Sequence, residues 1–271
     1  GKNITHHWKS FHIPAKTHFD NLVPLEPVKN DLLNRCEGPI ETQRARDGFA
    51  LTDHRMSLRD VMSEIHYCVY CHKNEGDFCS KGFPLKKNQP ELGFKINPTG
   101  ETLTGCPLEE KISEMHVVKK NGFGIGALAI VTIDNPMCAV TGHRICNDCM
   151  KSCIYQKQEP VNIPQIETRV LTDVLDLPWG VEIYDLLIRW NPLRQTQFTP
   201  KHYNGKKILV MGMGPAGFTA AHHLLMEGCA VVGCDGLKIE PLPEKLLMQP
   251  IKYFKDICES PRTHGGRPRS R

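Results

Sequence analysis

The stretch "KKILVMGMGPAGFTAAHHLLMEGCAVVGCD", residues 206–235, predicts a strand, a glycine turn, a helix and a second strand. Gly212, Gly214 and Gly217 form the pattern G-x-G-x-x-G between the first strand and the helix. The first glycine permits a tight turn, the second lets the backbone approach a pyrophosphate, and the third lets helix and strand pack closely. Asp235 ends the second strand, where a carboxylate accepts hydrogen bonds from ribose hydroxyls. The stretch predicts the start of a Rossmann-like dinucleotide-binding fold, and a βαβ unit without a nucleotide is the alternative interpretation.

Two further residues complete this candidate cofactor site. Pro215 and Ala216 follow the second glycine at the start of the helix, whose N-terminus binds phosphate. Only 36 residues follow Asp235, and a dinucleotide site is built across a larger sheet. We therefore expect residues 201–271 to form the first βαβ of a truncated dinucleotide-binding domain. The tail "PRTHGGRPRSR", residues 261–271, is expected to be disordered because nothing in it can be buried.

Charge and hydropathy indicate which kinds of partner the chain has. The four arginines of the tail account for the formal net charge of +4, so the remainder is neutral and lacks the basic balance typical of nucleic-acid-binding proteins. The longest apolar run, residues 123–133, is far shorter than the roughly 20 residues of a spanning helix. The first residues do not resemble a secretory signal. We expect a cytoplasmic protein with no nucleic-acid or membrane partner.

Upstream of residue 200 the hydrophobic pattern is helical. Ser57 is a plausible N-cap, and Leu58, Val61, Met62 and Ile65 then share one face. Four more helical patterns follow, at residues 107–122, 124–133, 163–177 and 181–190. The region from about residue 53 to 195 is therefore predicted to be all-helical, with cysteines on the connections. Residues 1–55, rich in His, Pro and charge, are predicted to form an irregular arm.

Twelve cysteines in such a chain favour metal or redox chemistry over a disulfide scaffold. Cys68, Cys71 and Cys79 form one group, Cys106 stands alone, and Cys138, Cys146, Cys149 and Cys153 form another. A zinc ribbon would place its C-x-x-C pairs about 15–20 residues apart, but 74 residues separate Cys71 from Cys146. A thioredoxin-like pair needs a strand that this region lacks. Iron–sulfur clusters, held by groups of thiolates on loops, fit better. Cys36, Cys138, Cys229, Cys234 and Cys258 are predicted to be ordinary buried thiols.

Several motifs, in order, resemble a known family of iron–sulfur flavoproteins. The matching pieces are "CVYC", "GCPLEEKISEM", "TGHRICNDCMKSC", "PVNIPQIE" and "ILVMGMGPAGFTAAHHLL", within roughly residues 60 to 236. The family comprises the small subunit of glutamate synthase and the N-terminal part of dihydropyrimidine dehydrogenase. The resemblance implies a mainly α, alpha-helical ferredoxin-type domain with two 4Fe-4S clusters at residues 56–200, followed by the start of an α/β Rossmann-like FAD-binding domain.

The resemblance also implies which residues bind the clusters. One cluster would take Cys68, Cys71, Cys79 and Cys153. The other would take Cys106, Cys146, Cys149 and Glu167, which stands where the pyrimidine enzyme has Gln. Relatives compress the first four cysteines into a short run, whereas seven residues here separate Cys71 from Cys79 and twenty-six separate Cys79 from Cys106.

The sequence therefore predicts an oxidoreductase in which hydride passes from NAD(P)H to FAD, and single electrons pass between FAD and the clusters. No side chain is an evident catalytic acid, base or nucleophile, so none is assigned. An electron-transfer partner subunit or domain fits this role. Two alternatives stay open: a zinc-stabilised binding module whose tail contacts nucleic acid, and an electron-transfer adaptor without turnover of its own.

Overall fold

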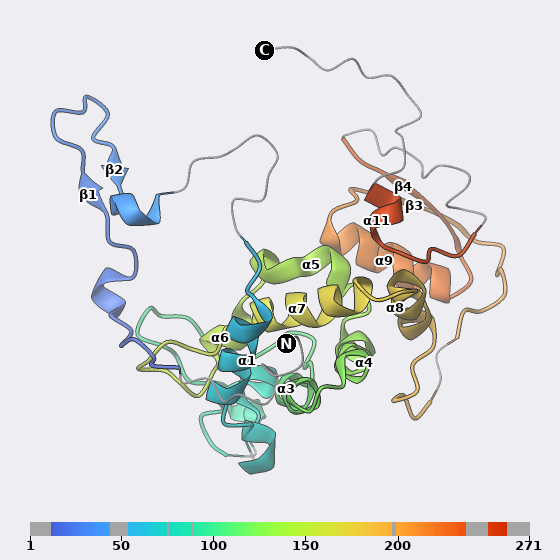
Figure 1. The fold of residues 1–271 in the computed structure, drawn as a ribbon, viewed down its shortest axis with the longest axis horizontal. Helices are drawn as coiled ribbons and strands as arrows, with labels where there is room; N and C mark the ends of the chain where they lie inside the picture. The colour runs from blue at the N-terminus through green and yellow to red at the C-terminus, as the bar shows by residue number, and fades with distance from the viewer. Residues whose placement is uncertain are drawn as a thin grey trace.

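A computed structural model describes residues 12–43, 54–74, 76–87, 89–196, 199–236 and 249–258. The Arg-rich tail at 261–271, with its predicted disorder, lies outside the described residues. Figure 1 shows a central group of helices, a hairpin projecting on one side, and a small sheet with its helix on the other. No helix in these ranges is long and apolar enough to cross a membrane.

The first helix, α1, spans Leu58–Tyr67 and begins where the sequence predicts. The Ser57 side chain accepts a hydrogen bond from the backbone N–H of Asp60, and the Asp60 carboxylate accepts one from the Ser57 backbone. This reciprocal cap satisfies two N–H groups that a helix start leaves without partners. Val61 and Ile65 are fully buried, so the predicted apolar face is confirmed as the face that packs on the core.

The remaining helices of the central region follow the predicted order, with one shift. They are α3 (Ile112–Lys120), α4 (Gly124–Asp134), α7 (Ile163–Leu175) and α8 (Gly180–Arg189). The pattern starting at Pro107 becomes helical only at Ile112, because residues 106–110 turn around the Cys106 side chain: the Glu109 N–H donates to the Cys106 carbonyl at 2.9 Å. Gly122 has φ of 87°, a left-handed conformation that ends α3 as expected.

Helix α7 lies in the middle of this region and packs against α1, α4, α5 and α8 (Figure 1). Ile166, Val170 and Val174 on its inner face are completely buried. They meet Leu128 of α4 and Met115 of α3 in one hydrophobic core, which also contains Cys79, Cys149 and Cys153. These three cysteines are therefore part of the core rather than on a detached loop.

The expectation of an all-helical region with cysteines on its connections is wrong in two places. Residues 82–104 form antiparallel bridges, Pro84 with Phe94 and Ile96 with Thr102, around the 3-10 helix η5 (Pro90–Leu92). Some cysteines also lie inside short helices, which are η4 (Cys71–Asn74), α2 (Phe78–Lys81), α5 (Cys138–Ile145) and α6 (Asp148–Lys151). Between α2 and α3 the reason is local, because glycines with positive φ at 82, 93 and 105 bend the chain too often for a longer helix.

The N-terminal arm, described over residues 12–43, contains paired segments between irregular stretches. Strands β1 (Glu26–Pro27) and β2 (Cys36–Glu37) form an antiparallel hairpin that projects from the helices in Figure 1. Two 3-10 turns flank it, η2 (Phe19–Asn21) and η3 (Ile40–Thr42). The base of the arm is anchored, since the Thr17 N–H donates to the Lys157 carbonyl at 3.1 Å.

The strand, turn, helix and strand predicted for residues 206–235 are confirmed. Strands β3 (Lys207–Met211) and β4 (Ala230–Cys234) pair in parallel, and α9 (Pro215–Met226) connects them. Side chains on the sheet remain exposed, with Met211 75% and Val232 61% accessible. The short helix α11 (Lys255–Cys258) follows. A complete Rossmann-like FAD domain, the ferredoxin-type assignment of the helices, and the boundaries at residues 55 and 200 stay predictions.

Candidate metal centre

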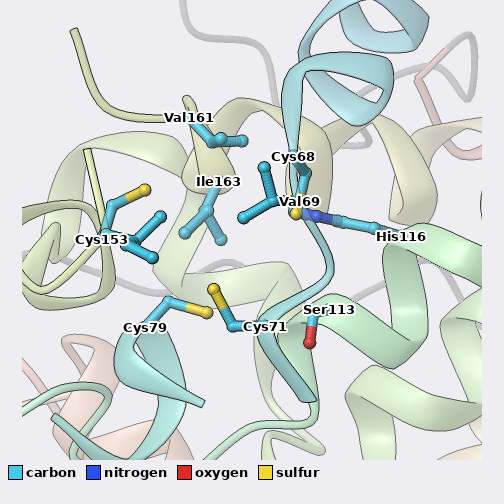
Figure 2. A pocket seen from close by; sticks show the side chains of 10 residues that line it. Cys68, Val69, Cys71, Cys79, Ser113, His116, Cys153, Val161 and Ile163 are labelled. Carbon is cyan, nitrogen blue, oxygen red and sulfur yellow. The ribbon is translucent and has the colours of Figure 1, made fainter. Parts of the chain in front are cut away.

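Four cysteines that are far apart in the sequence line one cavity. Cys68, Cys71, Cys79 and Cys153 line a small cavity of about 20 Å³. Figure 2 shows the Cys71 and Cys79 sulfur atoms pointing toward each other, with Cys68 and Cys153 on opposite sides of the view. The rest of the lining is Val69, Ser113, His116, Ile154, Val161 and Ile163. This is the set of four cysteines that the family resemblance implies for one cluster.

The end of α1 presents the first two of these thiols. Cys68 is the C-cap residue of α1, and Tyr70 follows in a left-handed conformation with φ of 51°. Such a conformation is costly for a non-glycine residue. Here the Tyr70 hydroxyl donates to the Ile65 carbonyl at 2.8 Å, and its backbone N–H points at the Cys68 sulfur at 3.4 Å. The reversal brings Cys71 back to the cavity.

A close approach of two backbone segments links Cys79 to Cys106. The Cys106 N–H donates to the carbonyls of Cys79 and Ser80, both at 2.9 Å. Gly105 has φ of 80°, and a Cβ at this position would lie 2.4 Å from the Gly82 nitrogen. No side chain fits there, so the glycine is required for the two cysteine-bearing segments to touch.

Replacing Gly105 with Ala should therefore destabilise the protein more than a left-handed backbone alone would. We expect a loss of about 3 kcal/mol, from about 1–2 kcal/mol of backbone strain together with an overpacking cost of similar size. Gly100→Ala is the matched control, because Gly100 also has positive φ but nothing lies within 4 Å of its added Cβ. Thermal unfolding followed by circular dichroism compares the two. Equal losses would mean that the contact between Gly82 and Gly105 does not matter.

Burial holds the thiols of the cavity in the protonated form. Desolvation raises the pKa of Cys68 to about 12, although the Tyr70 N–H partly opposes it. Desolvation and, to a smaller extent, the nearby Cys153 raise the pKa of Cys71 to about 11. The pKa of Cys79 is raised further, mainly by burial. A catalytic or exchange-active cysteine needs the opposite, a lowered pKa. A thiolate becomes favourable in this cavity only beside a positive charge, which metal ions supply.

Backbone N–H groups point at two of the four sulfur atoms. Besides the Tyr70 contact at Cys68, the Cys153 thiol faces the N–H groups of Tyr155, Val161 and Ile154, which partly offset the effect of burial on its pKa. Donors aimed at a sulfur stabilise its thiolate form, and such hydrogen bonds tune iron–sulfur clusters. The donor set therefore fits a bound cluster.

In the ranges that the structure describes, no three His, Cys, Asp or Glu side chains lie close enough together to hold one metal ion. A tetrahedral zinc site brings four donors within about 2.3 Å of one atom. In a four-iron cluster each thiolate binds its own iron, so the sulfur atoms stay farther apart. A cluster at the cavity of the four cysteines therefore stays a prediction.

The second implied ligand set is brought together only in part. Cys149 is buried, and after desolvation the largest effects raising its pKa come from Cys106 and Glu167. Cys146, in contrast, is exposed and donates to Asp148 at 3.5 Å. Three of the four residues are thus electrostatic neighbours, whereas Cys146, three residues before Cys149, is exposed at the surface.

Glu167 has partners that the sequence does not indicate. It accepts a hydrogen bond from the Asn135 side-chain amide at 3.4 Å, and burial together with the Glu110 carboxyl raises its pKa well above the ordinary value. Glu110 is itself buried and has a pKa of about 7, chiefly through desolvation. Cys138 is buried as predicted, yet Glu167 also lies in its electrostatic surroundings. Glu110 follows Cys106 by four residues, and this proximity is the only feature of the sequence that links Glu110 to the second ligand set.

The glycine turn has the geometry that its pattern requires. Gly212 has φ of 91°, and a Cβ on Gly217 would lie on the Gly212 carbonyl oxygen. Gly214 is the N-cap of α9, and its added Cβ would meet nothing within 4 Å, so a ligand could approach there. Pro215 and Ala216 form the first residues of α9. Asp235 accepts a hydrogen bond from the Met213 N–H at 2.7 Å, which places its carboxylate at the turn; its contact with a ribose stays a prediction.

Three known proteins share stretches of sequence with this chain. An uncharacterized protein of Rickettsia prowazekii is 53% identical over 120 residues, which are 44% of this chain and 17% of that protein. A second uncharacterized protein of the same organism is 36% identical over 83 residues, 27% of this chain and 26% of that protein. The glutamate synthase (NADPH) small chain of Mycobacterium tuberculosis is 28% identical over 128 residues, 47% of this chain and 23% of that protein. No protein-family model matches the chain.

These similarities are local. The matched segments cover no more than 26% of the length of each of these relatives. The chain is distantly similar to an oxidoreductase subunit, the glutamate synthase small chain that its motifs resemble. The activity, substrates and partners of the whole protein remain matters of proposal.

Proposed function

We propose that the chain holds two 4Fe-4S clusters and passes electrons between them and a flavin, as part of an NAD(P)H-dependent iron–sulfur flavoprotein oxidoreductase. One observation carries this proposal: four cysteines spread over residues 68 to 153 line a single cavity. The distant similarity to a glutamate synthase small chain supports the same class of protein. In this proposal the protein also exchanges electrons with a partner subunit or domain, in a reducing compartment such as the cytoplasm.

Each part of the cavity has a distinct task in this proposal. Cys68, Cys71, Cys79 and Cys153 would hold one cluster, and the clusters would supply one-electron chemistry when bound. Val69, Val161 and Ile163 exclude water from the sulfur atoms. The backbone N–H groups at Cys68 and Cys153 stabilise negative charge on sulfur.

The second ligand set in the proposal is Cys106, Cys146, Cys149 and Glu167. The neighbouring positions of Cys106, Cys149 and Glu167 support it. Cys146 would have to turn inward from the surface when iron binds, and its position on the C-cap of α5 leaves it outside the regular helices. Gly212, Gly214, Pro215, Ala216, Gly217 and Asp235 would bind the pyrophosphate and ribose of FAD.

Iron and sulfide analysis tests the proposal directly. Protein reconstituted anaerobically with iron and sulfide should carry about eight iron atoms per chain and show the broad visible absorption of thiolate-to-iron charge transfer. The same preparation is analysed for zinc. Stoichiometric zinc without iron would favour the zinc-stabilised module instead, and iron without any turnover of NAD(P)H by the whole protein would favour the electron-transfer adaptor.

A further inference from the structure

A histidine shares the cavity with the four cysteines. His116, on α3, is completely buried and lines the cavity with them. In Figure 2 its imidazole reaches the cavity on the side of Cys68 and Val69. Neither of its ring nitrogens has a hydrogen-bond partner in the part of the chain that the structure describes.

A buried imidazole without a hydrogen-bond partner destabilises a folded protein. An imidazole carries at least one N–H donor in either protonation state. Leaving a buried donor without an acceptor costs about 1–3 kcal/mol, and buried polar groups are nearly always paired. The cavity therefore lacks an acceptor that His116 is placed to use.

The other groups that line the cavity limit which atoms could accept a hydrogen bond from His116. The Ser113 hydroxyl is already in a hydrogen bond with Nδ1 of His72, at 2.5 Å. Val69, Ile154, Val161 and Ile163 contribute apolar side chains to the lining. The structure shows no hydrogen bond between the imidazole and Ser113. The other side-chain acceptors in the lining are the cysteine sulfur atoms, and a neutral thiol is a weak acceptor. A thiolate bound to iron, or an inorganic sulfide, is a much better one.

We propose that His116 donates a ring N–H to a sulfur atom of the cluster held by Cys68, Cys71, Cys79 and Cys153, and thereby raises the reduction potential of that cluster. This inference rests on the proposed function. Reduction adds an electron, and therefore negative charge, to the cluster. A donor aimed at its sulfur stabilises the reduced form more than the oxidised form, and hydrogen bonds to sulfur are a known determinant of cluster potentials.

The test is a redox titration of the reconstituted full chain, followed by electron paramagnetic resonance. His116→Leu removes the donor and keeps an apolar side chain, and it should lower one of the two potentials by about 59 mV, a tenfold change for a one-electron couple. His116→Gln restores an N–H donor and should recover most of that shift. Ser113→Ala is the control, because it changes the same cavity without removing the proposed donor.

The outcomes separate this inference from the proposed function. Iron content near eight atoms with unchanged potentials in His116→Leu would overturn the inference and leave the proposed function intact. Protein that binds no iron would overturn both. Should His116→Leu lose its iron, pulsed paramagnetic resonance of the unsubstituted protein carrying ¹⁵N-histidine decides the question. Coupling of the reduced cluster to a histidine nitrogen supports the bond, and its absence refutes it.

Discussion

Replacing Cys71 with Ser should reduce the bound iron from about eight atoms per chain to about four. Cys71 lines the cavity with Cys68, Cys79 and Cys153, so its loss removes one of four thiolates from a single cluster. A serine side chain is a much weaker iron ligand than cysteine. Its oxygen is a harder donor than sulfur, and its hydroxyl loses a proton less readily than a thiol does. We expect the cluster at this cavity to be lost and the other to remain. Iron and sulfide analysis with visible absorption measures the change.

Two further variants make the result specific. Cys149→Ser should remove the other cluster and leave the one at the cavity, because Cys149 lies beside Cys106 and Glu167. Cys36→Ser is the matched control. The prediction that Cys36 is buried is wrong, because it is an exposed thiol in β2 on the projecting arm, and its replacement should leave the iron content unchanged. Loss of all iron from both Cys71→Ser and Cys149→Ser, with the helical circular dichroism signal intact, would contradict two independent ligand sets.

The proposed ligands of the two clusters alternate along the sequence, and the structure also connects the two ligand sets. Cys153 follows α6 and shares the cavity with cysteines that precede α3, so one cluster would join both halves of the helical region. The hydrogen bonds from the Cys106 N–H to the Cys79 and Ser80 carbonyls join the two proposed sites directly. Losing one cluster should therefore lower the melting temperature as well as the iron content, because metal binding contributes to folding.

Features encoded by neighbouring residues were predictable from the sequence. The start of α1 follows from Ser57 and Asp60, three residues apart, and its buried face follows from Val61 and Ile65. The βαβ unit follows from its glycine spacing in the same way. The bridges between residues 82 and 104 were missed, because they depend on positive-φ glycines and on contacts between Pro84 and Phe94 that no periodic pattern encodes.

The candidate site was predictable only through the family resemblance. Residue spacing alone does not reveal that Cys68 and Cys153 share a cavity, because that depends on how α1 and the segment after α6 pack. His116 lies one turn after Ile112 on α3, so helical periodicity places it on the buried face. Its position facing sulfur, however, comes from tertiary packing. Glu110 lies within the helical pattern at residues 107–122, and its burial beside Glu167 also comes from tertiary packing.

The 271-residue chain should bind FAD weakly even when both clusters are present. The glycine turn and Asp235 provide a pyrophosphate cradle and a ribose contact, but a dinucleotide lies across a sheet of several strands. Between residues 199 and 236 the structure describes two paired strands, with Leu209 58% and Met211 75% exposed. A two-stranded sheet with open faces is marginal in water. Dialysed protein should lose nearly all added flavin, as measured by its absorbance and fluorescence.

Hydrogen exchange tests whether weak flavin binding comes from an incomplete FAD site or from an incorrect assignment of residues 206–235 to an FAD-binding domain. Amides of β3 and β4 should exchange much faster than those of α7, whose inner face is fully buried. A longer polypeptide that adds strands beside β3 and β4 should slow this exchange and retain flavin through dialysis, and Gly217→Ala should abolish that retention, because its Cβ would collide with the Gly212 carbonyl. If the 271-residue chain itself purifies yellow, exposed sheet faces must be covered by a second copy or a partner. Light scattering on the yellow protein would then show an assembly larger than one chain.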